Sequence, residues 1–450
     1  MNSPVYKKNK SSATQNTCTL CAPLGASVVF KGVENSMMIL HGGQGCATYI
    51  RRYIIGTCRE PVDIASSSFS ETEVIFGGEF SLGKAIDNVI AQYHPEVIGI
   101  ATTCLAETIG DDINGIIKKY NAKKNTGVHL IPISTPSYKG THIDGFNAAV
   151  YALCDFFAQP GTKENNVGIF PGFLSAADLR HIAEIVRSFK LEPIIVPDYS
   201  QTLDGGVWKT YHSIAPGGTG IARLKLLGSV RSAISFVTDQ VNDAAGLLHA
   251  RFGVPAQYLP VPIGVKATDS FVDTLKTISG REPDSVLVQD RARLIDSYID
   301  GHKMVYNKKT ILYGDAAFVS AMARFSCEIG LCPVCIATGD RSASLKKLVA
   351  DIEWPSAQKP HIVEDADFTD ILELSRTLNP DLVIGNSKGY QLSCELGVPL
   401  IRVGFPIADR IGGERILHTG YKGSQELYDR IVNTIIARSQ ESSDIGYGTY

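Results

Sequence analysis

The chain has 450 residues, of which 44% are hydrophobic and 20% are charged, and its formal net charge at pH 7 is −3. A charge this small gives no general attraction for nucleic acid or anionic lipid, so neither is an expected partner. No apolar run reaches the length of a membrane span, and the polar, basic N-terminus lacks the apolar centre of a secretory signal. We therefore expect a cytoplasmic globular protein, whose length predicts two or three domains.

Short apolar runs rich in Val and Ile alternate with amphipathic stretches along most of the chain. Residues 1–17 are expected to form a flexible N-terminal arm. Strands are predicted at 97–103, 128–134, 167–171, 193–197, 233–237, 256–261, 310–313, 333–337, 361–364, 381–385 and 399–403. Helical patterns lie between many of them, for example at 175–190, 316–328 and 342–352. Fully apolar strands that alternate with helices predict parallel sheets with helices on both faces.

Two breaks divide this pattern into three parts. Pro, Gly and charged residues cluster at 159–165, and a new strand begins after 301–309. The predicted fold is therefore α/β, with three Rossmann-like domains of similar size at 18–160, 161–305 and 306–450. Several strands run straight into small or polar residues, and the carboxyl ends of strands are where such sheets bind ligands.

Ten cysteines are distributed over the chain, at positions 18, 21, 46, 58, 104, 154, 327, 332, 335 and 394. Disulfides explain them poorly in a large cytosolic protein, so each is either a small buried hydrophobic residue or a metal ligand. The CPVC sequence at 332–335 reads as the start of a buried strand and has no second pair to complete a metal site. No phosphate-binding P-loop occurs, so this chain is not expected to hydrolyse ATP.

Three of the cysteines lie in loops suited to an iron–sulfur cluster. Cys21 in CAPLGA and Cys46 in HGGQGCATY occupy turns with Gly or Pro, and Cys104 in TTCLAETIGDD follows a strand and precedes a helix. Clusters need thiolates on rigid loops with backbone N–H groups nearby, and glycine lets that backbone approach closely. For any one of these cysteines, a buried free thiol is the commoner role. The spacing of the three does not by itself identify a cluster.

The sequence around these cysteines resembles the β subunit of the nitrogenase component 1 family. The similarity extends well beyond them and covers nearly the whole chain, from about position 18 to about position 437. It includes the stretches REPVDIASSSFSE, TPSYKGTHIDGF, PDYSQTLDGG, VPIGVKATDSF, RARLIDSYID, GNSKG and RVGFPIADR. The chain is identified on these motifs as a member of that family, which implies the three-domain α/β fold predicted above.

The resemblance implies a joint role for the three cysteines. The matching family residues ligate half of the P-cluster, an 8Fe-7S relay shared with an α-type subunit, so Cys21, Cys46 and Cys104 are the expected ligands; a 4Fe-4S cluster is the alternative. Ser137, in the TPS motif, matches a serine that can ligate the oxidised cluster, although a plain turn serine explains it equally well. Phe76 matches an aromatic residue where an ATP-dependent iron protein docks, whereas most phenylalanines are core residues.

The resemblance also implies a cation site between two β-type subunits. Arg59 and Glu60 match positions near that cation. Asp296 and Asp300, four apart on a predicted helix, match acidic residues that the other β-type subunit supplies. Hard cations prefer carboxylate and carbonyl oxygen ligands. The plainer alternative for these residues is a solvated acidic helix face.

By resemblance, the chain is the β-type subunit of an α₂β₂ reductase, a class that includes nitrogenase and methylthio-alkane reductase. Electrons pass from the iron protein through the shared cluster to a cofactor held in the α-type subunit. No catalytic residue is expected in this chain, which should be inactive alone. The alternative is the N-type scaffold subunit of cofactor assembly; the full cysteine set with Ser137 favours the reductase. Protochlorophyllide reductase and a non-redox α/β binding protein fit less well, since neither explains all three cysteines.

Overall fold

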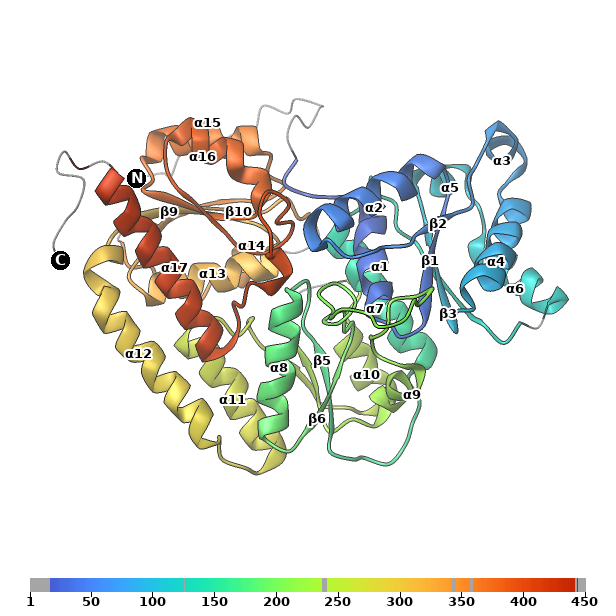
Figure 1. The fold of residues 1–450 in the computed structure, drawn as a ribbon, viewed down its shortest axis with the longest axis horizontal. Coiled ribbons are helices and arrows are strands. Elements are labelled where there is room, and N and C mark those ends of the chain that lie inside the picture. The colour runs from blue at the N-terminus through green and yellow to red at the C-terminus, as the bar shows by residue number, and fades with distance from the viewer. Residues whose placement is uncertain are drawn as a thin grey trace.

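The computed structural model describes residues 17–124, 126–236, 241–341, 345–356, 359–441 and 443. Three separate parallel sheets, each flanked by helices, follow one another along the chain (Figure 1). The predicted α/β fold is therefore confirmed. The expected flexible arm at 1–17 lies, apart from Thr17, outside the described residues. Within the described part of the chain, no helix is long and apolar enough to cross a bilayer.

The first sheet has the strand order β2-β1-β3-β4, with every pair parallel. Its strands are β1 Ser36–His41, β2 Ala65–Ser66, β3 Val97–Thr102 and β4 His129–Ile133. β1 and β3 are buried at every position, as central strands covered on both faces should be. The accompanying helices are α1 Ala22–Lys31, α2 Gln44–Cys58, α3 Glu71–Phe76, α4 Glu79–Tyr93, α5 Cys104–Ile109, α6 Ile113–Lys123 and α7 His142–Phe157.

The second sheet has the order β6-β5-β7-β8 and is again parallel throughout. Its strands are β5 Asn166–Phe170, β6 Glu192–Ile195, β7 Ala233–Ser235 and β8 Ala256–Tyr258. The helices that follow these strands are α8 Ala176–Ser188, α9 Ile221–Lys225, η1 Leu226–Ser229, α10 Ala244–Phe252, α11 Val265–Ser279 and α12 Ser285–Val305.

The third sheet has the order β11-β10-β9-β12-β13, also parallel. Its strands are β9 Lys309–Tyr313, β10 Cys332–Ala337, β11 His361–Val363, β12 Leu382–Gly385 and β13 Leu400–Arg402. Its helices are α13 Ala316–Glu328, α14 Leu345–Leu348, α15 Phe368–Leu378, η2 Ser387–Gly389, α16 Tyr390–Leu396, η3 Gly413–Arg415 and α17 Gly420–Glu441. The long helix α17 packs along α12 of the preceding part, so the second and third sheets share a helical layer (Figure 1).

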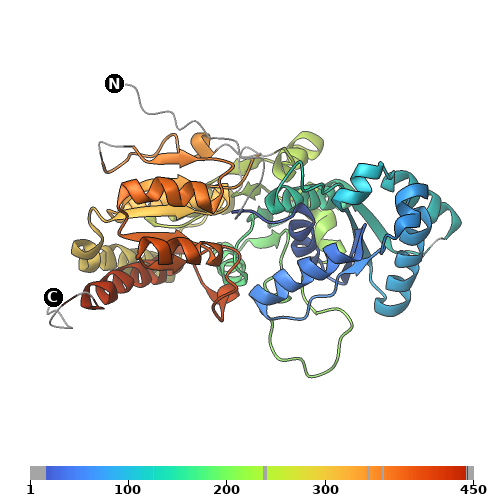
Figure 2. The same cartoon turned by 90° about the horizontal axis from the view of Figure 1, so that it is seen from above.

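One continuous hydrophobic core connects the three sheet units. The ring of Phe173, after β5, lies 4.5 Å from the ring of Phe405 in the third unit and 5.2 Å from that of Phe146 on α7. The first and third units stand at opposite ends of the molecule and meet across this centre (Figure 2). Each sheet falls within one of the predicted ranges 18–160, 161–305 and 306–450; the boundaries themselves remain a prediction.

Each predicted strand overlaps an observed one, from β3 to β13. The predicted helices correspond to α8, α13 and the much shorter α14; residues 342–344 lie outside the described part of the chain. CPVC begins the buried strand β10, as expected, with Cys335 fully enclosed. The prediction missed β1 and β2. The sequence SMMILH of β1 is rich in Met instead of β-branched residues, and β2 contains only two residues.

Helices α1 and α7 cross with their backbones in contact. A Cβ atom on Gly25 would lie 1.8 Å from the carbonyl oxygen of His142, and one on Gly145 would lie 1.9 Å from that of Ala22. Real Cβ atoms do not approach backbone this closely, so only glycine fits at either position. The crossing fixes the start of α1, and therefore Cys21 directly before it, against the start of α7.

Gly25→Ala should destabilise the chain by at least about 3 kcal/mol, because the new methyl group must push α1 away from α7. Urea unfolding of the full chain, followed by circular dichroism, measures the change. Gly83→Ala on α4 is the matched control, since its Cβ would make only ordinary contact, 3.8 Å from Tyr120. Equal unfolding midpoints for the two variants would contradict the role assigned to this crossing.

Candidate functional site

Cys21, Cys46 and Cys104 each stand at the N-terminus of a helix. Cys21 is the N-cap of α1, Cys46 lies in the first turn of α2, and Cys104 is the first residue of α5. All three are exposed, whereas every other cysteine except Cys394 is buried or half-buried. Helix N-termini carry partial positive charge and free N–H groups, which favour thiolates and bound anions.

The strand order explains how Cys46, Cys104 and Ser137 come to one place. β1, β3 and β4 are neighbours in one parallel sheet, and the loops that follow them carry these three residues in turn. The carboxyl ends of parallel strands share one edge of a sheet, so the loops meet there. Glu107 on α5 ties two of them together, because its carboxylate accepts a hydrogen bond from the hydroxyl of Ser134 at 2.5 Å.

Cys21 reaches the same edge from a helix instead of a strand. It forms an isolated antiparallel bridge with Thr141, the N-cap of α7. The backbone N–H of Ala22 donates a hydrogen bond to Oγ of Ser137 at 3.1 Å. Ser137 therefore lies beside the Cys21 turn, and the four residues predicted to bind a cluster gather at the carboxyl edge of the first sheet.

The three thiols are near enough to influence one another electrostatically. Partial burial raises the pKa of Cys46, and the negative charges of Cys21 and Cys104 raise it further. Among the residues whose positions are described, no three His, Cys, Asp or Glu side chains gather closely enough to hold a single metal ion. The three thiols therefore share one edge of the sheet.

The backbone beside Cys46 leaves room for a bound group. A Cβ atom on Gly43 or Gly45 would meet no atom within 4 Å, so the space before this turn is open. Gly42 has the opposite role: its φ is +151°, and a Cβ there would lie 1.8 Å from Oγ1 of Thr103. Gly42 lets the loops after β1 and β3 touch, and the next glycines keep access to the thiol clear. Donor type, exposure and open space together fit an iron–sulfur cluster.

A buried histidine–aspartate pair braces the Cys46 loop, and sequence reasoning missed it. Nε2 of His41 lies 3.0 Å from Oδ2 of Asp111, and its Nδ1 lies 3.1 Å from Oγ of Ser67. The Ser67 hydroxyl also accepts a hydrogen bond from the N–H of Gly42 at 2.9 Å. Burial lowers the pKa of His41, and the bond to Asp111 opposes that shift. Both partners stand in the motifs HGGQGC and TIGDD, but nothing local shows that they pair.

Phe76 lies in an exposed apolar patch on α3 and the start of α4. Phe76 and Phe80 are 82% and 81% exposed, and Ile75 is 73% exposed, so a core role for Phe76 is wrong. α3 buries none of its residues and is instead closed by a capping box, in which Ser70 and Glu73 bond reciprocally. These hydrogen bonds lower the pKa of Glu73 to about 2. A short capped helix displays its apolar side chains to solvent, as a docking surface would.

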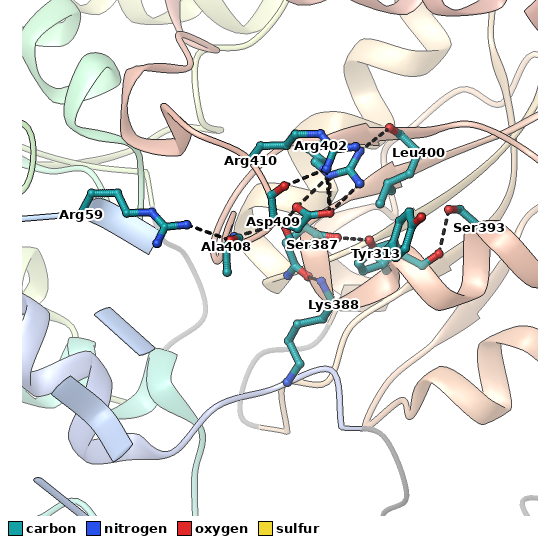
Figure 3. A network of polar contacts seen from close by, with 12 residues as sticks. Arg59, Tyr313, Ser387, Lys388, Ser393, Leu400, Arg402, Ala408, Asp409 and Arg410 are labelled. Atoms are coloured by element: carbon teal, nitrogen blue, oxygen red, sulfur yellow. Dashed lines mark hydrogen bonds and ion pairs between the residues drawn. The ribbon is translucent and has the colours of Figure 1, made fainter. Parts of the chain in front are cut away.

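The residues of the predicted cation site lie apart within one chain. Arg59 ends α2 in the left-handed conformation, and its guanidinium donates to the carbonyl of Ala408 at 3.3 Å (Figure 3). Glu60 follows, half-buried, while Asp296 and Asp300 are exposed on α12. A second subunit would have to complete the site, which stays a prediction. Metal analysis of the assembled complex, with and without Asp296→Asn, would check it.

The chain matches one family model and curated proteins along nearly its full length. Residues 21–436 match the family described as nitrogenase component 1 type oxidoreductase. A nitrogenase molybdenum-iron protein beta chain of Methanococcus maripaludis is 33% identical, with 98% of each chain covered. The nitrogenase vanadium-iron protein beta chain of Trichormus variabilis is 32% identical, covering 98% of this chain and 97% of the relative.

A cofactor-biosynthesis protein and a solved structure are similar as well. The nitrogenase iron-molybdenum cofactor biosynthesis protein NifN of Mesorhizobium japonicum is 32% identical, covering 95% of this chain and 92% of the relative. A solved chain titled nitrogenase Cp1 at pH 6.5 superposes with a TM-score of 0.92 at 30% identity, covering 98% of this chain and 97% of that one.

A buried acid joins the far end of α2 to the other two sheet units. The thiol of Cys58, the last residue of α2, hydrogen-bonds the carboxylate of Glu414 on η3. The N–H of Ala176, at the start of α8, donates to the same carboxylate at 3.2 Å. Burial raises the pKa of Glu414 to about 7. The folded chain therefore binds a proton here that the unfolded chain, with an ordinary carboxyl pKa, releases at lower pH.

Glu414→Gln should make the stability of the chain less dependent on pH. Because the folded pKa is raised, wild-type stability is lost as pH rises from about 4.5 to about 7. The variant should thus exceed wild type at pH 8 by roughly 1–3 kcal/mol and differ little at pH 5. Urea unfolding at both pH values measures this, with the exposed Glu282→Gln as control. An identical pH dependence in wild type and Glu414→Gln would show that Glu414 is charged in the folded chain.

Proposed function

Because this chain belongs to the nitrogenase component 1 type oxidoreductase family, we propose that it is the β-type subunit of an iron–sulfur reductase complex. Cys21, Cys46 and Cys104 would ligate half of an 8Fe-7S cluster, with the other half on an α-type subunit. One observation carries the proposal: these three thiols are exposed together at one sheet edge, whereas all the other cysteines except Cys394 are buried or half-buried. When bound, the cluster supplies single-electron storage and relay toward a cofactor in the α-type subunit.

The residues of this chain have separate tasks in the proposal. The thiolates bind iron, and the helix N-termini beneath them stabilise the negative charge of thiolate and sulfide. Gly43 and Gly45 let backbone approach the group without a Cβ clash. Ser137 already accepts one hydrogen bond through Oγ, from Ala22, and its hydroxyl is proposed as an additional oxygen ligand beside Cys21. No group in this chain is proposed to act on substrate.

Two protein partners follow from the exposed features. The α-type subunit would cover the open half-site in a cytoplasmic assembly of two α-type and two β-type subunits. The patch of Ile75, Phe76 and Phe80 is proposed to dock an ATP-dependent iron protein. The chain alone leaves both surfaces uncovered, so we propose that it is inactive by itself.

A scaffold role in cofactor assembly is the second candidate, and the 32% identity to a NifN protein favours it. The two roles differ in what the purified complex does. A reductase turns over substrate when given the iron protein and ATP. A scaffold reduces nothing by itself but restores activity to a component 1 that lacks its cofactor. Adding the complex to such a cofactor-deficient protein separates the two functions.

Cys46→Ala should lose most of the cluster iron from the complex with the α-type partner. The variant removes one of three thiolates that this chain supplies, while Cys335→Ala removes a thiol enclosed in β10 and should keep the iron. Iron per complex after anaerobic purification, together with the visible absorption of the cluster, is the measurement. Full iron and an unchanged spectrum in Cys46→Ala would refute the ligand assignment.

Phe76→Ala should slow electron delivery from the iron protein at least about tenfold without changing the iron content. Truncating a highly exposed aromatic residue removes contact area with the partner, and the helix caps leave α3 intact. Initial rates at several iron-protein concentrations measure the effect. Ile411→Ala removes an apolar side chain of similar exposure, 75%, from the third unit and serves as control. Equal rates for both variants would place the docking surface elsewhere.

A further inference from the structure

The segment that leads to Cys21 runs along the third sheet unit before it enters the first. Thr17 forms an isolated bridge with Asp367, at the start of α15. Gly339, after β10, packs so closely here that a Cβ on it would lie 2.4 Å from Cγ2 of Thr19 and 3.0 Å from Cβ of Cys18. The approach to the first ligand is therefore shaped by a part of the chain more than 300 residues away.

Lys388 bonds this segment directly from the third unit. Its ammonium donates a hydrogen bond to the carbonyl of Thr19 at 2.9 Å, two residues before Cys21. The lysine extends from η2 across to the N-terminal segment (Figure 3). Burial lowers the pKa of Lys388, while the charges of Cys18, Cys21 and Asp315 oppose that shift. A charged donor on a carbonyl is among the stronger hydrogen bonds in proteins.

The loop that holds Lys388 is rigid. The N–H of Lys388 donates to Oδ1 of Asn386 at 3.1 Å, and the side-chain amide of Asn386 donates to the carbonyl of Phe405 at 2.9 Å. The hydroxyl of Ser387 donates a hydrogen bond to the carboxylate of Asp409, and Nη2 of Arg402 donates another to the same carboxylate at 2.6 Å (Figure 3). These contacts fix the backbone from which the lysine reaches, and the hydrogen bond to Thr19 holds its ammonium end.

Acidic groups of the third unit also lie near the Cys21 turn. Nε2 of His142, the first residue of α7, lies 3.1 Å from Oδ1 of Asp315. The hydroxyl of Thr141, which bridges Cys21, lies 3.3 Å from Oδ1 of Asp340. Lys388 therefore brings a cation to the neighbourhood of this turn, where Asp315 and Asp340 of the same unit supply two carboxylates.

We infer that Lys388 is a positioning residue for the cluster ligand Cys21: it anchors the Cys18–Cys21 segment through the Thr19 carbonyl and places a half-buried positive charge near that segment. The effect of this charge on a bound cluster rests on the proposed function, whereas the anchoring of the segment does not. The third unit would then help to set both the location of Cys21 and the net charge around the cluster ligands of this chain. A nearby positive charge stabilises the reduced, more negative state of a bound cluster and so raises its reduction potential.

Hydrogen exchange of the full-length chain without iron tests the anchor. In Lys388→Met, the amides of Leu20 and Ala22 should exchange about tenfold faster than in wild type, since the segment opens more readily. Lys388→Arg keeps charge and donors and should restore slow exchange. Lys309→Met is the matched control, because this exposed lysine also bonds a carbonyl of the third unit, that of Leu378. Should the methionine variant not fold, Lys388→Gln removes the same charge.

The reduction potential of the cluster in the assembled complex tests the charge. It should be more negative in Lys388→Met than in wild type, unchanged in Lys309→Met and restored in Lys388→Arg. Exchange at Leu20 and Ala22 that matches wild type, or a potential that does not move, would overturn the inference. A wild-type complex without iron would instead refute the proposed function, and the exchange experiment would still decide whether Lys388 anchors the segment.

Discussion

Direct backbone contact between α1 and α7 is the constraint on which the rest of the site depends. Gly25 and Gly145 let the two helices touch with no side chain between them. The contact delivers Cys21 from a helix to the edge where β1, β3 and β4 end. Cys46, Cys104 and Ser137 arrive there through strand order alone. A wider crossing would leave three loops at the edge and the first thiol elsewhere, so the four-residue arrangement would not form.

The thiols of Cys21, Cys46 and Cys104 are exposed to solvent, and their negative charges favour binding of a positively charged group there. Partial burial raises the pKa of Cys46, and the charges of Cys21 and Cys104 raise it further, whereas helix N-termini favour negative charge at this edge. In the proposed complex, bound iron would supply positive charge at this edge, and the α-type subunit would supply further ligands across the exposed face. Hydrogen bonds from other parts of the chain support these segments: the His41–Asp111 pair beside the Cys46 loop, the Glu107 carboxylate on Ser134, and Lys388 of the third unit on Thr19.

The sequence supports the fold further than it supports the site. Val- and Ile-rich runs identify the strands from β3 onward, because buried parallel strands are apolar along their length. The prediction missed β1 because its Met-rich run merges with the glycine motif that follows it, and Cys46 lies just after that strand, in the first turn of α2. The three cysteines can be singled out by their loops and family resemblance, but their convergence follows from strand order. The contacts of His41 with Asp111 and of Lys388 with Thr19 span 70 and 369 positions, so no local pattern reveals them.

We propose that this chain presents half of a shared cluster to an α-type partner. The most direct measurement is anaerobic co-purification of the two chains, followed by iron counting and EPR spectroscopy of the reduced and oxidised complex. We expect about eight iron atoms in an oxidisable cluster for each pair of chains, beyond those of the partner's own cofactor. A complex without that iron, with Cys21, Cys46 and Cys104 all free to react with a thiol reagent, would contradict it.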